Sequence, residues 1–167
     1  MSTKLIRRAL IASGIFIGAA VAFSPTAKAA NTADVGLGGS VTSTVGIVTN
    51  NTTGTGLNLG GDGTTPTPHV VQVADFTMST NNEQGLSLSV PVGTMTKTNG
   101  TTITYQVKVV DHLATAPEAV DFSSGDQTYT TNAAGPANRD LYINYTPANF
   151  QDPGAYTGSI TLTVSDR

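Results

Sequence analysis

Residues 156–165 read YTGSITLTVS, an almost unbroken alternation of apolar or aromatic residues with hydroxyl residues. Successive side chains of a β-strand point to opposite faces of the sheet, so a period of two predicts a half-buried strand. A second stretch with this period lies near the other end of the chain: Val35, Leu37, Gly39 and Val41, then Val45 and Ile47. The two stretches predict a β-sheet protein in which strands near both ends take part.

Between these stretches, apolar residues alternate again in residues 69–79, 86–92, 102–109 and 141–145. No segment has a convincing helical period, and Gly, Pro and Asn clusters interrupt the chain roughly every 8 to 15 residues, as in proteins built of short strands and turns. Residues 111–138 look irregular, with short β-prone pieces at 119–122 and 127–131. We therefore expect an all-β domain, an immunoglobulin-like antiparallel sandwich of about seven or eight strands, with a closed barrel as the alternative.

The first 29 residues have the layout of a secretory signal peptide. Basic Lys4, Arg7 and Arg8 precede an apolar stretch of 14 residues, Leu10–Phe23, and Ala27-Lys28-Ala29 provides a small-x-small cleavage site. The apolar stretch is shorter than the ~20 residues of a membrane-spanning helix. We expect residues 1–29 to be a signal peptide, 30–48 an N-terminal strand segment, 49–68 a flexible Thr/Asn/Gly loop and 69–167 the sandwich body.

Composition narrows the class of protein. After signal removal, four basic residues remain against eleven acidic ones, a net charge of −7. A sparse acidic surface disfavours nucleic acid or an anionic membrane as a partner, because both need clustered Lys and Arg. The chain has no Cys and no Trp. We expect a secreted or cell-surface protein with no membrane span in its mature part.

Three stretches together resemble the spore coat U family and the related archaic chaperone–usher pilins. They are residues 39–48 (GSVTSTVGIV), 102–109 (TITYQVKV) and 152–164 (DPGAYTGSITLTV). Those families usually carry a Cys in the opening strand where this chain has Gly46, so the chain resembles a cysteine-free variant. The resemblance implies a surface subunit that polymerises by strand donation, in which the N-terminal extension of one subunit supplies a strand that its neighbour lacks.

That mode of assembly predicts which residues interact. Val35, Leu37, Gly39 and Val41 would form the donor, and Tyr156, Ile160, Leu162 and Val164 would line the acceptor. A donated strand and a strand paired within its own domain have the same alternation, so three alternatives stay open for the N-terminal segment: pairing within its own domain, donation to a neighbour, and a disordered start.

Candidates for chemistry are few. Asp121, Ser123 and Asp126 place oxygen atoms like the start of a calcium loop, but the closing bidentate acid is missing, and a polar turn is the simpler interpretation. Asp111-His112 invites a general-base role, yet adjacent strand residues point to opposite faces. Tyr129 and Tyr142 are candidates for exposed sugar-stacking rings, whereas Tyr105 and Tyr145 should face inward. We expect no catalytic site, no cofactor and no metal.

The sequence thus predicts a non-enzymatic structural subunit of an extracellular fibre, pilus-like filament or surface coat involved in adhesion or biofilm. Its partners would be copies of itself or related surface subunits, with or without a periplasmic chaperone. The alternative is a monomeric secreted binding module for carbohydrate or a surface protein. A secreted hydrolase with an unrecognised site is a third and weaker possibility.

Overall fold

The computed structural model describes residues 36–60, 63 and 65–167. The predicted signal peptide and Val35 lie outside these residues. The chain divides into two units, residues 1–39 and 40–167. In the first unit, Gly36–Gly39 belong to no strand, and the Leu37 side chain is 94% exposed.

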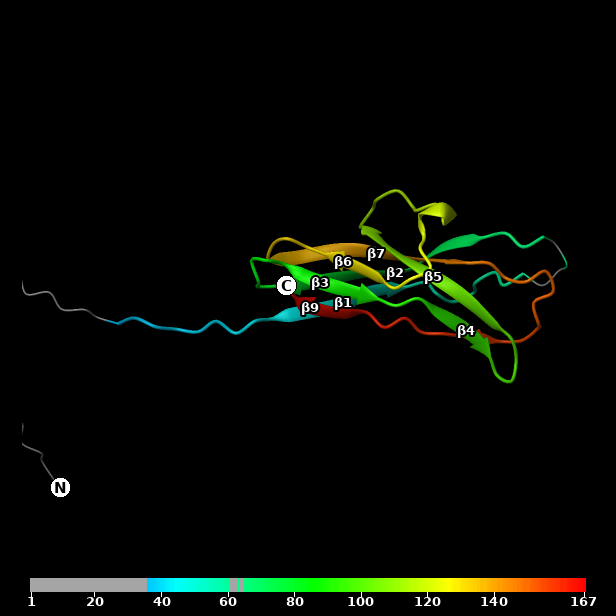
Figure 1. Ribbon diagram of the computed structural model, residues 1–167, viewed down its shortest axis with the longest axis horizontal. Helices are drawn as coiled ribbons and strands as arrows, with labels where there is room; N and C mark the ends of the chain where they lie inside the picture. The colour runs from blue at the N-terminus through cyan, green and yellow to red at the C-terminus, as the bar shows by residue number, and fades with distance from the viewer. Residues whose placement is uncertain (1–35, 61–62, 64) are drawn as a thin grey trace, which may run out of the picture. The chain divides into compact units, whose positions relative to one another are not determined.

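The described residues of the second unit are all-β apart from one short 3-10 helix, η1 (Ala119–Asp121) (Figure 1). Its described residues form nine strands: β1 (Val45–Thr52), β2 (His69–Thr80), β3 (Leu86–Val90), β4 (Gly93–Lys97), β5 (Thr102–Asp111), β6 (Gln127–Thr130), β7 (Gly135–Tyr145), β8 (Tyr156–Thr157) and β9 (Thr163–Asp166). Among these residues, no helix is long and apolar enough to span a membrane.

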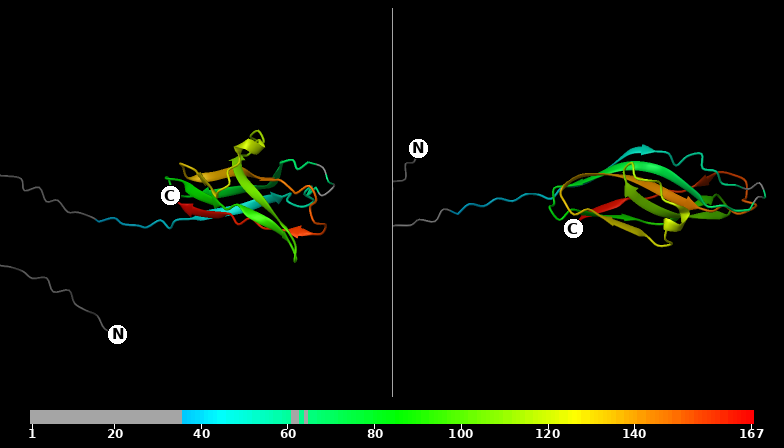
Figure 2. Two further views of the ribbon diagram at one scale, coloured as in Figure 1. Left: turned by 45° about the vertical axis from the view of Figure 1, so that its right-hand side comes forward. Right: turned by 90° about the horizontal axis from the view of Figure 1, so that it is seen from above.

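The strands form two antiparallel sheets. One has six strands in the order β1-β2-β7-β5-β4-β8, and the other has three in the order β6-β3-β9. Both sheets contribute to one hydrophobic core, in which Phe76 and Met78 of β2 and Leu86, Leu88 and Val90 of β3 are fully buried. Two sheets that share a core are consistent with a β-sandwich (Figure 2).

The two ends of the described fold meet. β1 and β9 lie side by side, although they come from opposite ends of the chain (Figure 1). Each is the outermost strand of its sheet. The edges of the two sheets are therefore neighbours, and their separation decides whether the core is closed on this side.

The predicted N-terminal strand begins later than expected. Residues 36–44 lie outside every strand, and β1 starts at Val45. The first part of β1 pairs regularly with β2, from Val45 opposite Thr80 to Thr49 opposite Phe76. Pairing with β2 extends the strand to Thr52, into the stretch predicted to be a flexible loop.

The last alternating stretch does not form one strand. Its beginning pairs with the six-stranded sheet, where Tyr156 lies opposite Lys97, and its end pairs with the other sheet, where Val164 lies opposite Leu88. Residues 158–162 cross between the sheets outside any strand. The described residues therefore form nine strands rather than seven or eight, partly because one predicted strand is divided into two.

Two further expectations were wrong. Residues 119–121 are helical rather than extended, because the Asp121 carboxylate accepts a hydrogen bond from the Glu118 backbone N–H (2.8 Å) in a capping box. The supposedly irregular residues 135–138 are the start of β7, since their backbone pairs with the end of β2. In both places local bonds or sheet pairing overrode propensity.

Candidate functional site: an open groove over the core

A groove of about 660 Å³ opens onto the core of the second unit. Its floor is apolar and comes from the inner face of the six-stranded sheet: Val73, Ala74, Met95, Tyr105, Leu141 and Ile143. Its walls come from the end of β1, from residues 54–59 and from residues 154–162. None of the described residues that line it carries a charge.

The groove exists because the two sheets differ in strand length. β2 and β7 have 12 and 11 residues, whereas β3 has five and β6 and β9 have four each. The small sheet therefore covers only part of the inner face of the large one. Over the rest, non-strand segments take the place of a sheet.

The first wall is the free edge of β1. Among the strands that the structure describes, β2 is the only neighbour of β1 in its sheet. Ile47 packs against the core, but Thr49 and Thr52 farther along the strand line the groove and are exposed. Because β1 is an edge strand, the backbone N–H and C=O groups along its unpaired edge are available to a further strand.

The second wall is the crossing segment, residues 158–162. Ile160 and Leu162 pack partly against the core and are only half-buried. A hydrogen bond from the buried Tyr105 hydroxyl to the Ser159 carbonyl (2.8 Å) fixes the segment. Gly158 allows a close approach to β4, because a Cβ there would lie 2.9 Å from the Thr94 carbonyl oxygen. Burial raises the pKa of the Tyr105 hydroxyl, so this donor keeps its proton through the neutral range.

Three of the four predicted acceptor residues line the groove. Ile160 and Leu162 belong to its second wall, and Tyr156 lines the groove just before that wall. Val164 does not line it, because it lies in β9 and pairs with Leu88. The alternation correctly identified the inward-facing residues but carried no information on which of them a second sheet would cover.

The predicted donor residues are exposed where they are described. Leu37 and Val41 are 94% and 90% exposed, and no atom lies within 4 Å of a Cβ built on Gly39. Val35 lies outside the described residues. Exposed apolar side chains at alternate positions are what a segment needs in order to pair with a sheet as an added strand.

Side-chain hydrogen bonds hold the chain just before β1. The Asn81 side chain accepts from the Thr44 backbone N–H (2.9 Å) and donates to the Thr42 carbonyl (2.9 Å). The Ser43 hydroxyl donates to the Asp166 carboxylate, which also accepts from the Thr80 hydroxyl (2.7 Å). Sequence analysis missed both Asn81 and Asp166, because these contacts join positions far apart in the chain.

The residues weighed as a calcium loop make hydrogen bonds within the protein. Asp121 caps η1, Asp126 accepts from the Val92 backbone N–H (3.0 Å), and the Ser123 hydroxyl contacts Gln127. In the part of the chain that the structure describes, no group of three or more His, Cys, Asp or Glu residues could hold a metal ion.

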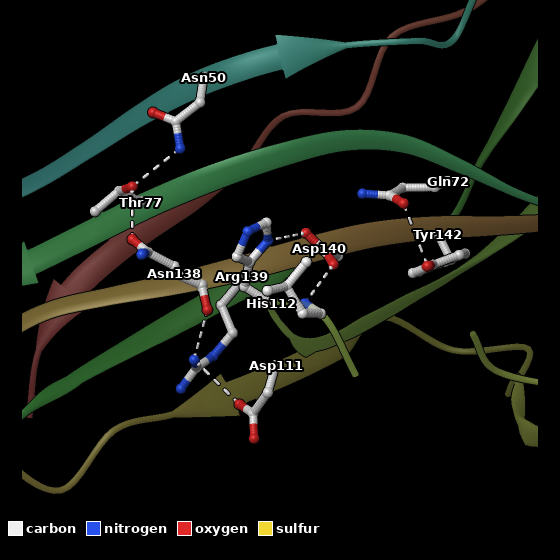
Figure 3. A network of polar contacts seen from close by, with 10 residues as sticks. Asn50, Gln72, Thr77, Asp111, His112, Asn138, Arg139, Asp140 and Tyr142 are labelled. Carbon is white, nitrogen blue, oxygen red and sulfur yellow. Dashed lines mark hydrogen bonds and ion pairs between the residues drawn. The ribbon is translucent and has the colours of Figure 1, made fainter. Parts of the chain in front are cut away.

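A network of polar contacts joins residues of β1, β2, β5 and β7 and of the loop after β5 (Figure 3). Buried Asp140 accepts from the Leu113 backbone N–H (3.1 Å) and lies 2.8 Å from His112 Nδ1. The Tyr142 ring is buried there and its hydroxyl donates to Gln72 (3.3 Å), so the expectation of an exposed Tyr142 was wrong. Tyr129 is half-buried beneath Arg139, whose guanidinium carbon lies 4.5 Å from the ring centre. These contacts fix the sheet and its connecting loop.

Comparisons with known proteins add no relative: no protein-family model matches the chain, and neither a curated protein nor a solved structure was found to match it.

Proposed function

We propose that this chain is an immunoglobulin-like sandwich that lacks one strand, and that it is an exported structural subunit of a surface fibre, pilus-like filament or coat. The N-terminal segment of one copy, residues 35–41, would occupy the groove of the next copy. The observation that carries this proposal is the uncharged, apolar groove between the free edge of β1 and the unpaired segment 158–162. The family resemblance of the sequence supports the same conclusion.

The chemistry of the two parts is complementary. The groove offers an apolar floor, and the donor offers Leu37 and Val41, both almost fully exposed. Burying each such side chain fully is worth about 1.5–3 kcal/mol. Backbone hydrogen bonds to an open edge would add about 0.5–1.5 kcal/mol each, which is the strand-addition mode of recognition.

The way the chain enters β1 favours a second copy as the occupant. Asn81 and Asp166 hold residues 42–44 beside the start of β1, where Val45 pairs with Thr80. The groove lies along the other half of β1, at Thr49 and Thr52. To fill its own groove, the segment would have to reverse direction directly before β1, which would require release of these bonds.

Placing charges on the apolar face of the donor tests the proposal. The full chain, exported and purified, is compared with a Leu37→Asp/Val41→Asp variant by light scattering and negative-stain electron microscopy. Gly38→Asp/Ser40→Asp is the matched control, because it adds the same charge on the opposite face of the segment.

We expect filaments or large assemblies from the natural chain and the control, and monomers from Leu37→Asp/Val41→Asp. A natural chain that stays monomeric at high concentration, even with its export machinery present, would contradict the proposal and would favour the monomeric binding module. Equal assembly by all three proteins would contradict the role of this segment.

A further inference from the structure

We infer that residues 53–60 form a displaceable cover over one end of the groove, and that an incoming strand must remove this cover before it can be fully seated. The inference rests on the function proposed above and concerns the regulation of the same site. It assigns a role to part of the stretch, residues 49–68, that the sequence predicts to be a flexible Thr/Asn/Gly loop.

Two leucines place the cover on the core. Leu57 and Leu59 are half-buried, pack against the core cluster and line the groove. They alternate around Asn58, so they offer the core the same pattern that a strand would offer. They lie over the part of the large sheet that the three short strands do not cover.

One hydrogen bond ties the middle of the cover to the core. The hydroxyl of Tyr145, a fully buried residue of β7, donates to the Asn58 carbonyl (3.0 Å). Within the described residues, no backbone–backbone hydrogen bond involves residues 54–60. In the described chain, residues 54–60 of the cover are therefore held on the core by two apolar side chains and one side-chain bond, without the ladder bonds of a true strand.

The start of the cover is anchored to β2, and its end lies close to Pro147. At the start, Thr53 donates to the Val73 carbonyl through its backbone N–H (2.8 Å) and to the Gln72 carbonyl through its hydroxyl (2.7 Å). At the end, Gly60 adopts a positive φ of 65° close to Pro147. Gly54 and Gly56 lie between these two positions, and glycine adds backbone freedom to the segment.

Competition for the floor makes the cover a regulator. A donor strand that lies between β1 and residues 158–162 needs the apolar floor on which Leu57 and Leu59 now rest. A strand would gain backbone hydrogen bonds that the cover does not make, so exchange is favourable once the donor is present. Until then the cover shields the core and delays non-specific association.

The absence of natural cysteines permits a clean test. The receiver is the full chain carrying Leu37→Asp/Val41→Asp, so that its own donor is inactive. A single reporter cysteine is added, Leu59→Cys in the cover or Ile160→Cys in the opposite wall. The probe is a synthetic peptide of residues 33–43, and the control peptide carries the same two Asp substitutions.

The rate of thiol labelling is measured with and without peptide. We expect the natural peptide to slow labelling of Ile160→Cys and to speed labelling of Leu59→Cys about tenfold, as expected for local opening. The control peptide should change neither rate. Slower labelling at both positions, or no change at Leu59→Cys while Ile160→Cys is shielded, would overturn the cover but leave the proposed function standing.

A second variant resolves the case in which the peptide changes neither rate. Leu57→Ser/Leu59→Ser loosens the cover, and Leu113→Ser/Val120→Ser is the matched control at two exposed apolar positions. Peptide binding by the loosened receiver alone, followed by fluorescence anisotropy, would show that the cover blocks the groove. No binding by either receiver would overturn both the cover and the proposed function.

Discussion

The two halves of the core have the same residue pattern and different surroundings. In the closed half, Met78 of β2 and Leu88 of β3 are both fully buried at the core that the two sheets share. In the open half, Ile143 of β7 forms part of a groove floor, and Ile160 and Leu162 stay half-buried at its rim. Alternation determines which side chains face inward, whereas the length of the opposing sheet determines whether they are covered.

The two halves should differ most in the free energy of unfolding that is lost when a leucine side chain is truncated. Leu88→Ala should lower the free energy of unfolding by about 2–5 kcal/mol, because it leaves a cavity in close-packed surroundings. Leu162→Ala, at the half-exposed groove wall, should cost about 1 kcal/mol in the monomer. Urea unfolding of the assembly-deficient Leu37→Asp/Val41→Asp chain measures both. Equal losses would mean that the two halves are equally closed.

Gly158 should be the most sensitive position of the open half. An alanine Cβ there would lie 2.9 Å from the Thr94 carbonyl oxygen, so the wall must move away from β4. We expect a stability loss of about 1–3 kcal/mol, typical of overpacking, together with weaker assembly. Gly125→Ala is the control, since nothing lies within 4 Å of its Cβ. A neutral Gly158→Ala would show that the wall position is not fixed by this contact.

Two tyrosine hydroxyls hold the groove walls and should matter less. Tyr105→Phe removes the bond to Ser159, and Tyr145→Phe removes the bond to Asn58. Each should cost about 0.5–1.5 kcal/mol in thermal or urea unfolding. Tyr145→Phe should also speed labelling of Leu59→Cys, while Tyr105→Phe should not. Identical labelling rates in the two variants would contradict the assignment of these two bonds to separate walls of the groove.

The smallest effect concerns pH at the closed end. Hydrogen bonds from Ser43 and Thr80 lower the pKa of the Asp166 carboxyl from its ordinary value of 3.8. A lowered pKa stabilises the fold above pH 3.8, and this contribution is lost as the pH falls through the lowered value. The amide signals of residues 42–44 should therefore shift in NMR spectra only below pH 3.8. Asp166→Asn should abolish that transition, and a transition that persists would assign it to another group.

Alternation of apolar residues predicted the position of β2 along the chain. Residues 69–79 were expected as a strand and form β2. Strict alternation would place Val73 and Ala74 on opposite faces, but an irregularity in the register with β7 between Gln72 and Ala74 lets both line the groove. Such a bulge depends on the partner strand, so the β2 sequence alone does not reveal it.

The groove itself was only half predictable. Tyr156, Ile160 and Leu162 followed from their alternation, but the crossing of residues 158–162 between sheets depends on pairing with β4 at one end and β3 at the other. Leu57 and Leu59 gave a weak signal as two apolar residues in a polar stretch. Their contact with the core could not be inferred, because it depends on the short strands of the small sheet.

The most direct test of strand exchange is a cross-link between copies. Two single-cysteine chains, Leu37→Cys and Ile160→Cys, are mixed under mild oxidation, with Val120→Cys replacing Ile160→Cys as the control. We predict a disulfide-linked heterodimer only from the first mixture, and a covalent ladder from the chain that carries both Leu37→Cys and Ile160→Cys. A cross-linked monomer from that double variant, with no heterodimer in the mixture, would show that the segment fills its own groove and would contradict donation between copies.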